Sequence, residues 1–327
     1  MIPPRASRGR LVVAACTFLL VVSGCGVGDG SDIGPSLPDQ PAASCKVVVL
    51  DDQGRGVVGA AVRVAGFTAL TGRNGRGDLL AEPRGRQLVA IDARDAAAAN
   101  GDALPAFAVA TTITGPDLPA VLHVPDLSAS ATVVPGSQAA ASTITTAAGA
   151  ILTIRAGSSV GITSGAGNAV VRAGDLRPEH LPGDLPLAAP GALLFTAGVW
   201  IDAPAVSFTP AARIDVADTL GSGNGQVRTF RFDPAAGEWS ELATANAAGG
   251  RIVSDVAVTQ TGLYAFAAAV PATSVTGRIV DSAGVVLLDV LVRVDQSTTV
   301  TDRNGVFAAA GVPAALADGS ARSAAVE

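Results

Sequence analysis

One short stretch of this chain occurs twice at a fixed spacing. Residues 62–75 read VRVAGFTALTGRNG, and residues 292–305 read VRVDQSTTVTDRNG, an ungapped offset of 230 positions. Short apolar–polar alternations beside an Asn-Gly pair predict antiparallel strands joined by tight turns, because Asn and Gly adopt the positive φ that such turns need. Turn residues that recur at a constant offset imply a shared backbone path. The sequence therefore contains a duplicated β unit.

The composition favours strands over helices throughout the chain. Among 327 residues there are 38 Gly and 20 Pro, only 15% are charged, and only 4% are aromatic. Such a composition suits short strands with many turns, and the length suits two or three small domains. Between the two copies, FDPAAGEW (232–239) predicts two strands joined by an Asp-Pro…Gly corner, and TGLYAFAA (261–268) predicts a further strand. We expect an all-β fold.

The spacing of the repeated residues resembles that of a known small domain. The pattern D..G..V.GA.V.V, with Gly54 leading into residues 57–64, and T...NG at 71–75 are similar to the carboxypeptidase regulatory-like domain. The resemblance implies a small transthyretin-like, Ig-like β-sandwich, and it carries no peptidase residues. The aromatic residue that usually follows the Asn-Gly turn is Phe307 in the second copy and is replaced by Gly77 in the first. Residues 142–158 resemble the start of a ZU5-like β domain.

These patterns divide the protein into five parts. AVLHVPDL (120–127) is expected as a strand that leaves the first sandwich. After Pro313 the second copy lacks a closing strand like RQLVAID (86–92), so the unit is expected to be held by packing on the middle domain or by a partner strand, or to reflect a truncated reading frame. The parts are a signal peptide (1–24), a flexible tether (25–44), a β-sandwich with its exit strand (45–126), a larger β-sandwich middle domain (127–270) and an incomplete second unit (274–327).

The N-terminus is typical of an exported lipoprotein. Arg5, Arg8 and Arg10 precede an apolar run at 11–22, which has the length of a signal h-region and is short for a membrane span. The following VSGC resembles a bacterial lipobox, which implies cleavage before Cys25 and its acylation, for example with palmitate. An ordinary secretory signal is the alternative. Several acyl chains would give stable membrane anchoring without a spanning helix.

Net charge and the residue after the lipidation cysteine bear on partners and location. The formal charge is −6, and loss of residues 1–24 removes three arginines and no acid, which makes it −9. This charge disfavours nucleic acid as a partner. In lipoproteins of two-membrane bacteria, an aspartate directly after the lipidated cysteine resembles an inner-membrane retention signal. This chain has Gly26 at that position, so the outer membrane or cell surface is favoured as the location.

Cysteine usage offers no internal disulfide in the mature protein. Cys16 leaves with the signal peptide and Cys25 carries lipid, which leaves Cys45. We interpret Cys45 as a buried thiol at the start of a strand, and an intermolecular disulfide is the alternative.

The residues that could act in catalysis or metal binding lack the sequence context that either function requires. GSSVG places Ser159 in a G-x-S-x-G pattern, but no helix is expected after it, as a nucleophile elbow requires. His123 and His180 are the only histidines, too few for a zinc site by themselves. Asp215, Asp218 and Asn224 border a Gly-rich loop without the spacing of a calcium motif. We predict no catalytic residue, no metal and no cofactor.

The aromatic residues leave two functional interpretations open. Trp200, Trp239 and Tyr264 are expected to fill the sandwich cores, and the alternative is that Trp200 and Trp239 stack on a sugar. The leading interpretation is a non-enzymatic cell-envelope lipoprotein that acts as a structural or adhesive scaffold and contacts an envelope protein or glycan. A carbohydrate-binding surface lipoprotein is the alternative, and a hydrolase that uses Ser159 is the third class.

Overall fold

The computed structural model describes most of the residues that follow the tether, and their regular structure is β. Two single-turn 3-10 helices occur in that part, η1 (Arg73–Gly75) and η2 (Pro178–His180), and the all-β prediction is confirmed. The leader and Cys25 lie outside the described residues. Within the described part, no helix combines the length and the apolar character needed to cross a membrane. The described residues are 45–81, 83–96, 101, 103–113, 120–162, 167–182, 185–186, 191–203, 206–219, 226–258, 261–294 and 297–315.

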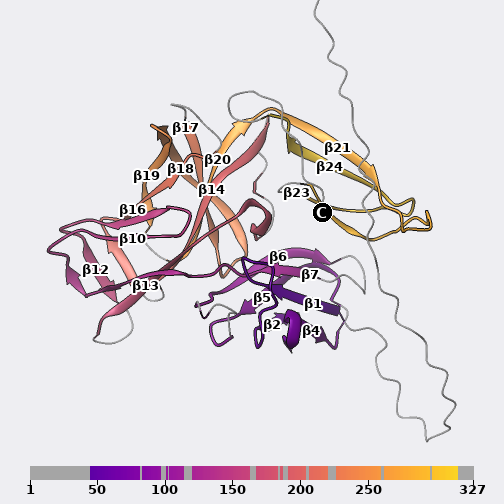
Figure 1. Cartoon of the computed structure of the whole chain (residues 1–327), viewed down its shortest axis with the longest axis horizontal. Helices are drawn as coiled ribbons and strands as arrows, with labels where there is room; N and C mark the ends of the chain where they lie inside the picture. Colours follow the sequence, from indigo (N-terminus) through magenta and orange to yellow (C-terminus); the bar gives the residue numbers. More distant parts are fainter. Residues whose placement is uncertain are drawn as a thin grey trace, which may run out of the picture.

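The first unit is a two-sheet sandwich of seven strands (Figure 1). One sheet has the order β4-β1-β7, with β1 (Cys45–Leu50), β4 (Arg76–Leu79) and β7 (Ala120–His123). The other has the order β3-β2-β5-β6, with β2 (Ala61–Val64), β3 (Phe67–Leu70), β5 (Gly85–Asp92) and β6 (Ala106–Ile113). The expected exit strand at 120–127 is instead an integral part of the unit, because β7 pairs in parallel with β1. Its polar–apolar pattern alone did not reveal this long-range pairing.

The second unit repeats the first at the level of residue pairs. Its four described strands are β21 (Ala272–Arg278), β22 (Leu291–Val294), β23 (Ser297–Val300) and β24 (Val306–Pro313). Strand β21 pairs with β24 as β1 pairs with β4, and β22 pairs with β23 as β2 pairs with β3. The matching registers are Cys45↔Leu79 with Val275↔Ala309, and Ala61↔Leu70 with Leu291↔Val300. The sequence offset of 230 is therefore also the structural offset.

The recurring polar residues hold the loops of both units by the same hydrogen bonds. Asp51 Oδ1 accepts the N–H groups two and four residues further on, both at 2.9 Å, and Asp281 does so at 2.9 and 2.8 Å. Thr71 accepts the Ala60 N–H at 2.9 Å, and Thr301 accepts the Val290 N–H at 2.9 Å. Because buried or partly buried backbone N–H groups need partners, these side chains take the place of a missing strand neighbour.

Glycine is required where the Asn-Gly turn packs under the strand. Gly75 and Gly305 both have a φ of +68°. A Cβ on Gly75 would lie 2.0 Å from the Val49 carbonyl oxygen, and one on Gly305 would lie 2.7 Å from the Ile279 carbonyl oxygen. The close approach, together with the left-handed backbone, explains why the turn keeps glycine in both copies.

The middle region forms a ten-stranded sheet and a small three-stranded one. The large sheet has the order β10-β11-β16-β19-β18-β17-β20-β14-β13-β8, and its two edge strands, β10 and β8, contact each other. The sheet thus curls back on itself, as sheets of this size usually do. Its strands are β8 (Ala129–Val133), β10 (Ser142–Thr145), β11 (Ile151–Ile154), β13 (Ala169–Asp175), β14 (Ala192–Asp202), β16 (Ala212–Ala217), β17 (Gln226–Asp233), β18 (Glu238–Ala248), β19 (Arg251–Val258) and β20 (Gly262–Val270). The small sheet contains β9 (Gly136–Ser137), β12 (Ser159–Ile162) and β15 (Val206–Thr209).

Strand β20 separates two hydrophobic cores. Leu263 and Ala265 belong to one cluster of buried residues, while Tyr264 and Phe266 belong to another. Successive side chains of a strand point to opposite faces, so a strand that is apolar at nearly every position is covered on both sides. Inside the curl lies the core that contains Tyr264. The other core faces the first unit.

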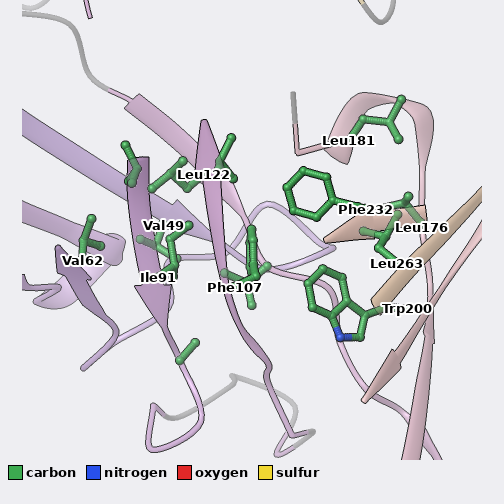
Figure 2. Close-up of a cluster of buried hydrophobic side chains, with 14 of the residues drawn as sticks. Val49, Val62, Ile91, Phe107, Leu122, Leu176, Leu181, Trp200, Phe232 and Leu263 are labelled. Atoms are coloured by element: carbon green, nitrogen blue, oxygen red, sulfur yellow. The ribbon is translucent and has the colours of Figure 1, made fainter. Parts of the chain in front are cut away.

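That other cluster, here called the shared core, continues without a break into the first unit. It joins side chains of the first sandwich to side chains of the large sheet. The Phe107 and Trp200 rings pack in a T-shaped arrangement, with centroids 5.0 Å apart and an interplanar angle of 60°. Figure 2 shows these two sets of side chains meeting: Val49, Val62, Ile91, Phe107 and Leu122 from the first unit, and Leu176, Leu181, Trp200, Phe232 and Leu263 from the middle region.

The second unit has a core of its own. Val292, Val294, Phe307, Ala309 and Val312 form a separate buried cluster. Pro271 alone connects β20 to β21, and its carbonyl accepts the Ala314 N–H at 2.8 Å. In Figure 1 the first unit, in indigo and purple, lies below the middle sheet, and the second unit, in yellow, lies to its right.

Candidate functional site

The first unit docks on the middle region through the corner that the sequence predicted in FDPAAGEW. The outer edge of β6 donates the Ala108 N–H to the Pro234 carbonyl at 2.7 Å and the Ala110 N–H to the Gly237 carbonyl at 3.2 Å. Gly237 has a φ of +69°, and a Cβ there would lie 2.7 Å from the Ala110 nitrogen. The β17–β18 hairpin therefore covers an edge strand that would otherwise be open.

The two histidines of the protein stack on each other at this same boundary. His123, at the end of β7, and His180, in η2, have ring centroids 4.1 Å apart and an interplanar angle of 9°. Asp52 Oδ1 lies 3.2 Å from His180 Nδ1, and its Oδ2 accepts the Asp126 N–H at 2.9 Å. A turn of the first unit is thereby tied to η2 of the middle region.

Further charged groups complete this cluster, called here the histidine junction (Asp52, His123, Asp126, His180 and Arg293). Arg293 of the second unit donates from Nη2 to the Pro178 carbonyl at 3.2 Å. The junction thus joins the first unit, the middle region and the second unit at one place.

Next to the junction, the buried Asp51 accepts Arg55 Nε at 2.8 Å, and Arg55 Nη2 lies 3.9 Å from Asp126 Oδ2. A carboxylate at this degree of burial needs a nearby cation or hydrogen bonds, and Asp51 has both.

Burial decides the charge of His123. It lowers the pKa of His123 to about 4, and the neighbouring His180 and the positive charge of Arg293 act in the same direction. His123 Nδ1 is buried and has no hydrogen-bond partner among the described residues. At neutral pH the His123 ring is therefore uncharged.

The histidine junction lacks the features of a metal centre. Over the described residues, no three or more His, Cys, Asp and Glu side chains are grouped so that they could hold a metal ion. Sequence reasoning treated the two histidines separately, because His123 lies in an apolar strand and His180 in a Pro-rich loop. Nothing in the local pattern around either residue indicated that they would stack.

The tryptophans are placed mainly as core residues. Trp200 has 0% of its surface exposed, so neither face of its indole is open to a stacking ligand. Trp239 is half-buried and forms a T-shaped pair with Phe232, with ring centroids 5.2 Å apart. Tyr264 is buried in the core inside the curl, where desolvation raises its pKa to about 12. The structure gives no support to a sugar platform built on Trp200.

Ser159 is the first residue of β12, where it pairs with Thr209 and Ser137 in the small sheet. A nucleophile elbow instead places its serine in a sharp turn between a strand and a helix. The local structure around Ser159 is therefore that of an ordinary strand residue.

Of the residues that border the Gly-rich loop, Asp215 forms an ion pair with Arg251, and the Asp218 N–H donates to the Gly250 carbonyl at 2.9 Å. Asn224 lies outside the described residues. The Asp215 carboxylate is thus engaged by a cation from the protein itself, whereas the printed Asp218 contact involves its backbone only.

Cys45 is buried at the start of β1, and desolvation raises the pKa of its thiol. A disulfide between molecules would first require this side chain to become accessible. The burial agrees with the interpretation of Cys45 as a strand residue of the core.

Among the described residues, the strands of the second unit have fewer paired neighbours than those of the first. In the first unit β2 lies between β3 and β5, and β1 lies between β4 and β7. In the second, β22 pairs with β23 alone and β21 with β24 alone, as far as the described residues extend. Nearby, Val285 and Leu288 are 57% and 58% exposed. The outer edge of β22 (Leu291–Val294) thus has no neighbouring strand among the described residues, which end at 315.

Comparison of the protein with protein families, with characterised proteins and with solved structures found no match.

Proposed function

We propose that this protein is a non-enzymatic lipoprotein of the bacterial cell envelope, which acts as a structural or adhesive scaffold. The observation that carries the proposal is how the duplicated residues are used. Asp51, Thr71 and Gly75, like Asp281, Thr301 and Gly305, are engaged in backbone hydrogen bonds or close backbone packing. Duplication has thus preserved a spacer-like β module and its turns, which suits a scaffold.

The proposed architecture has carboxypeptidase regulatory-like, transthyretin-like units on both sides of a ZU5-like domain. Two-sheet packing in the first unit and the matching registers in the second support this description. The lipobox-like VSGC sequence supports an anchor at Cys25, which places the protein on a membrane, with the outer membrane or cell surface favoured. Residues 26–44 would then act as a leash between the lipid and the folded body.

The anchor is tested by comparing two cysteine variants. We expect the wild-type protein to incorporate radiolabelled palmitate and to partition into detergent, because acylated Cys25 carries the lipid. Cys25→Ala should lose both properties, whereas Cys45→Ala, which changes the same residue type in the folded body, should keep both. Mass spectrometry that finds an intact, unlipidated leader in the wild-type protein would overturn the proposed anchor.

Glycan binding is tested separately from scaffolding. A glycan array probed with the wild-type protein and with Trp239→Ala examines the half-buried ring, whose partial exposure is the remaining support for a sugar contact. We expect no glycan signal that depends on Trp239. A signal lost in Trp239→Ala would replace the scaffold proposal with the carbohydrate-binding alternative.

A further inference from the structure

The second unit meets the rest of the protein at its linker and at the histidine junction. Pro271 alone connects β20 to β21, and β24 contacts β14 in addition. At the junction, Arg293 of β22 donates from Nη2 to the Pro178 carbonyl at 3.2 Å. Because the buried cluster of the second unit is separate from the shared core, release of the junction contact would not by itself unfold the unit.

Arg293 holds the short helix that carries one of the two stacked histidines. Pro178 is the first residue of η2, and His180 is its last. The His180 ring lies flat on the His123 ring, with centroids 4.1 Å apart and an interplanar angle of 9°. The second unit, η2 and the end of β7 are therefore connected by one continuous series of contacts.

The surroundings of His123 favour its uncharged ring while these contacts are in place. Burial, His180 and Arg293 lower the pKa of His123 to about 4, and they outweigh Asp51 and Asp52, which act in the opposite direction. The charged and titratable groups of the junction come from the turn after β1, from the residues after β7, from η2 and from β22: Asp51, Asp52, Arg55, Asp126, His180 and Arg293.

A proton on His123 favours any arrangement in which water reaches the ring. If η2 moves away, the ring regains the ordinary histidine pKa of about 6.5, whereas the pKa is about 4 while η2 is in place. The open arrangement therefore binds the proton first as pH falls, so the ratio of open to closed molecules rises below pH 6.5 and levels off below pH 4. For one group with these two pKa values, the ratio increases roughly 20-fold between pH 7 and pH 5.

We propose that the histidine junction is an acid-sensitive latch, which holds the second unit against η2 and opens when His123 is protonated. Opening separates η2 from His123 and breaks the Arg293 contact, and the second unit stays folded and joined through Pro271. This inference goes beyond the proposed scaffold function, because it makes the placement of the second unit depend on acidity. It does not involve the lipid on Cys25, so the latch and the anchor can fail independently.

Amide hydrogen exchange measures the opening. The His180 N–H donates to the Arg177 carbonyl at 3.0 Å, so its exchange reports on η2. In the purified full-length protein, we expect the opening constant of this amide, corrected for the intrinsic effect of pH on exchange, to rise roughly 20-fold between pH 7 and pH 5. The amides that pair β21 with β24 should keep their protection. An unchanged opening constant, or loss of the β21–β24 protection over the same pH range, would overturn the proposal.

Substitutions separate the latch from a general effect of acid. His123→Asn removes the titrating ring and keeps a polar side chain, so the increase between pH 7 and pH 5 should fall below about threefold. Arg293→Gln should raise the opening constant of the His180 amide already at pH 7. Arg63→Gln, at the equivalent exposed position of the first unit, is the matched control and should leave it unchanged. An undiminished increase in His123→Asn, or equal effects of the two arginine substitutions, would count decisively against the latch.

The pH at which opening begins provides a second measurement that needs no variant. If His123 is the group that responds, the opening constant should start to rise near pH 6.5, the ordinary pKa of an exposed histidine. If the carboxylates of the junction respond instead, the rise should start only near their ordinary pKa of about 4. A rise that begins only below about pH 5 would therefore overturn the proposal even if His123→Asn does not fold.

Discussion

Single residues at the histidine junction have properties that depend on burial rather than on residue type. His123 is an uncharged ring stacked on His180 because its surroundings exclude water, and Arg293 opposes a further positive charge. The ordinary histidine pKa of about 6.5 would permit protonation in mildly acidic surroundings. In the folded protein the pKa of His123 is lower, so its ring is protonated only in more acidic solution. Acid should therefore weaken the histidine junction.

The pH dependence of stability follows from the sign of this shift. Since the pKa of His123 is about 4 in the folded protein and about 6.5 in the unfolded state, the unfolded state binds the proton first as pH falls. The uncharged His123 therefore makes its full contribution to the free energy of unfolding above pH 6.5. This contribution is lost as pH falls toward 4, by up to about 1.4 kcal/mol per pH unit. Urea unfolding at pH 7 and pH 4.5 should show a smaller decrease for His123→Asn than for the wild type. Equal decreases, or a His123 NMR titration midpoint near 6.5, would contradict the prediction.

Whole elements are held together by backbone contacts that side-chain patterns only partly indicate. The β17–β18 corner was predictable, since Asp-Pro and Gly mark a turn. Its role in covering the edge of β6 was not, because the hydrogen bonds from Ala108 and Ala110 join segments more than a hundred residues apart. Gly237 permits this contact by having no side chain at the point of closest approach.

Gly237→Ala should therefore destabilise the protein more than the same change in an open turn. Gly249 in the β18–β19 turn is a matched control, with a φ of +60° and no atom within 4 Å of an added Cβ. We expect a cost of about 1–2 kcal/mol for Gly249→Ala from the left-handed backbone alone, and at least about 3 kcal/mol for Gly237→Ala, where steric overlap adds to the strain. Chemical denaturation measures both, and the β6 amides should exchange faster only in Gly237→Ala. Equal losses of stability in the two variants would show that the β17–β18 corner is not in tight contact with β6.

At the scale of the whole molecule, the boundaries of the hydrophobic cores do not coincide with the boundaries of the sequence units. The shared core joins the first unit to the large sheet, whereas the second unit keeps a separate, smaller cluster. Cooperative unfolding follows shared buried surface. The protein should therefore unfold as two bodies, one of which combines the first unit with the middle region.

Two core substitutions test this division. Phe107→Ala removes a ring that packs on Trp200 in the shared core and should shift the main unfolding transition by about 3–5 kcal/mol. Val292→Ala should weaken only a smaller transition of the second unit, by about 2 kcal/mol. Scanning calorimetry with hydrogen exchange assigns each transition to its strands. A single transition shifted by both variants, or a separate transition for the first unit, would contradict the two-body description.

The sequence by itself determined the local features of this protein. The all-β class, the duplicated unit and the Asn-Gly turns followed from the residues, since turn chemistry and two-residue alternation act within a few positions. The buried placement of Cys45 and Trp200 also followed from residue type.

Only the tertiary structure decided which surfaces meet. A strand such as β20, apolar at almost every position, indicates that both of its faces are covered, but the pattern does not identify the covering elements. The same ambiguity applied to β7, whose parallel pairing with β1 bridges more than seventy residues, and to the two histidines. Hydrophobic burial is non-directional, so many pairings of apolar surfaces satisfy one sequence pattern. Shape and backbone hydrogen bonding of the complete fold select among them.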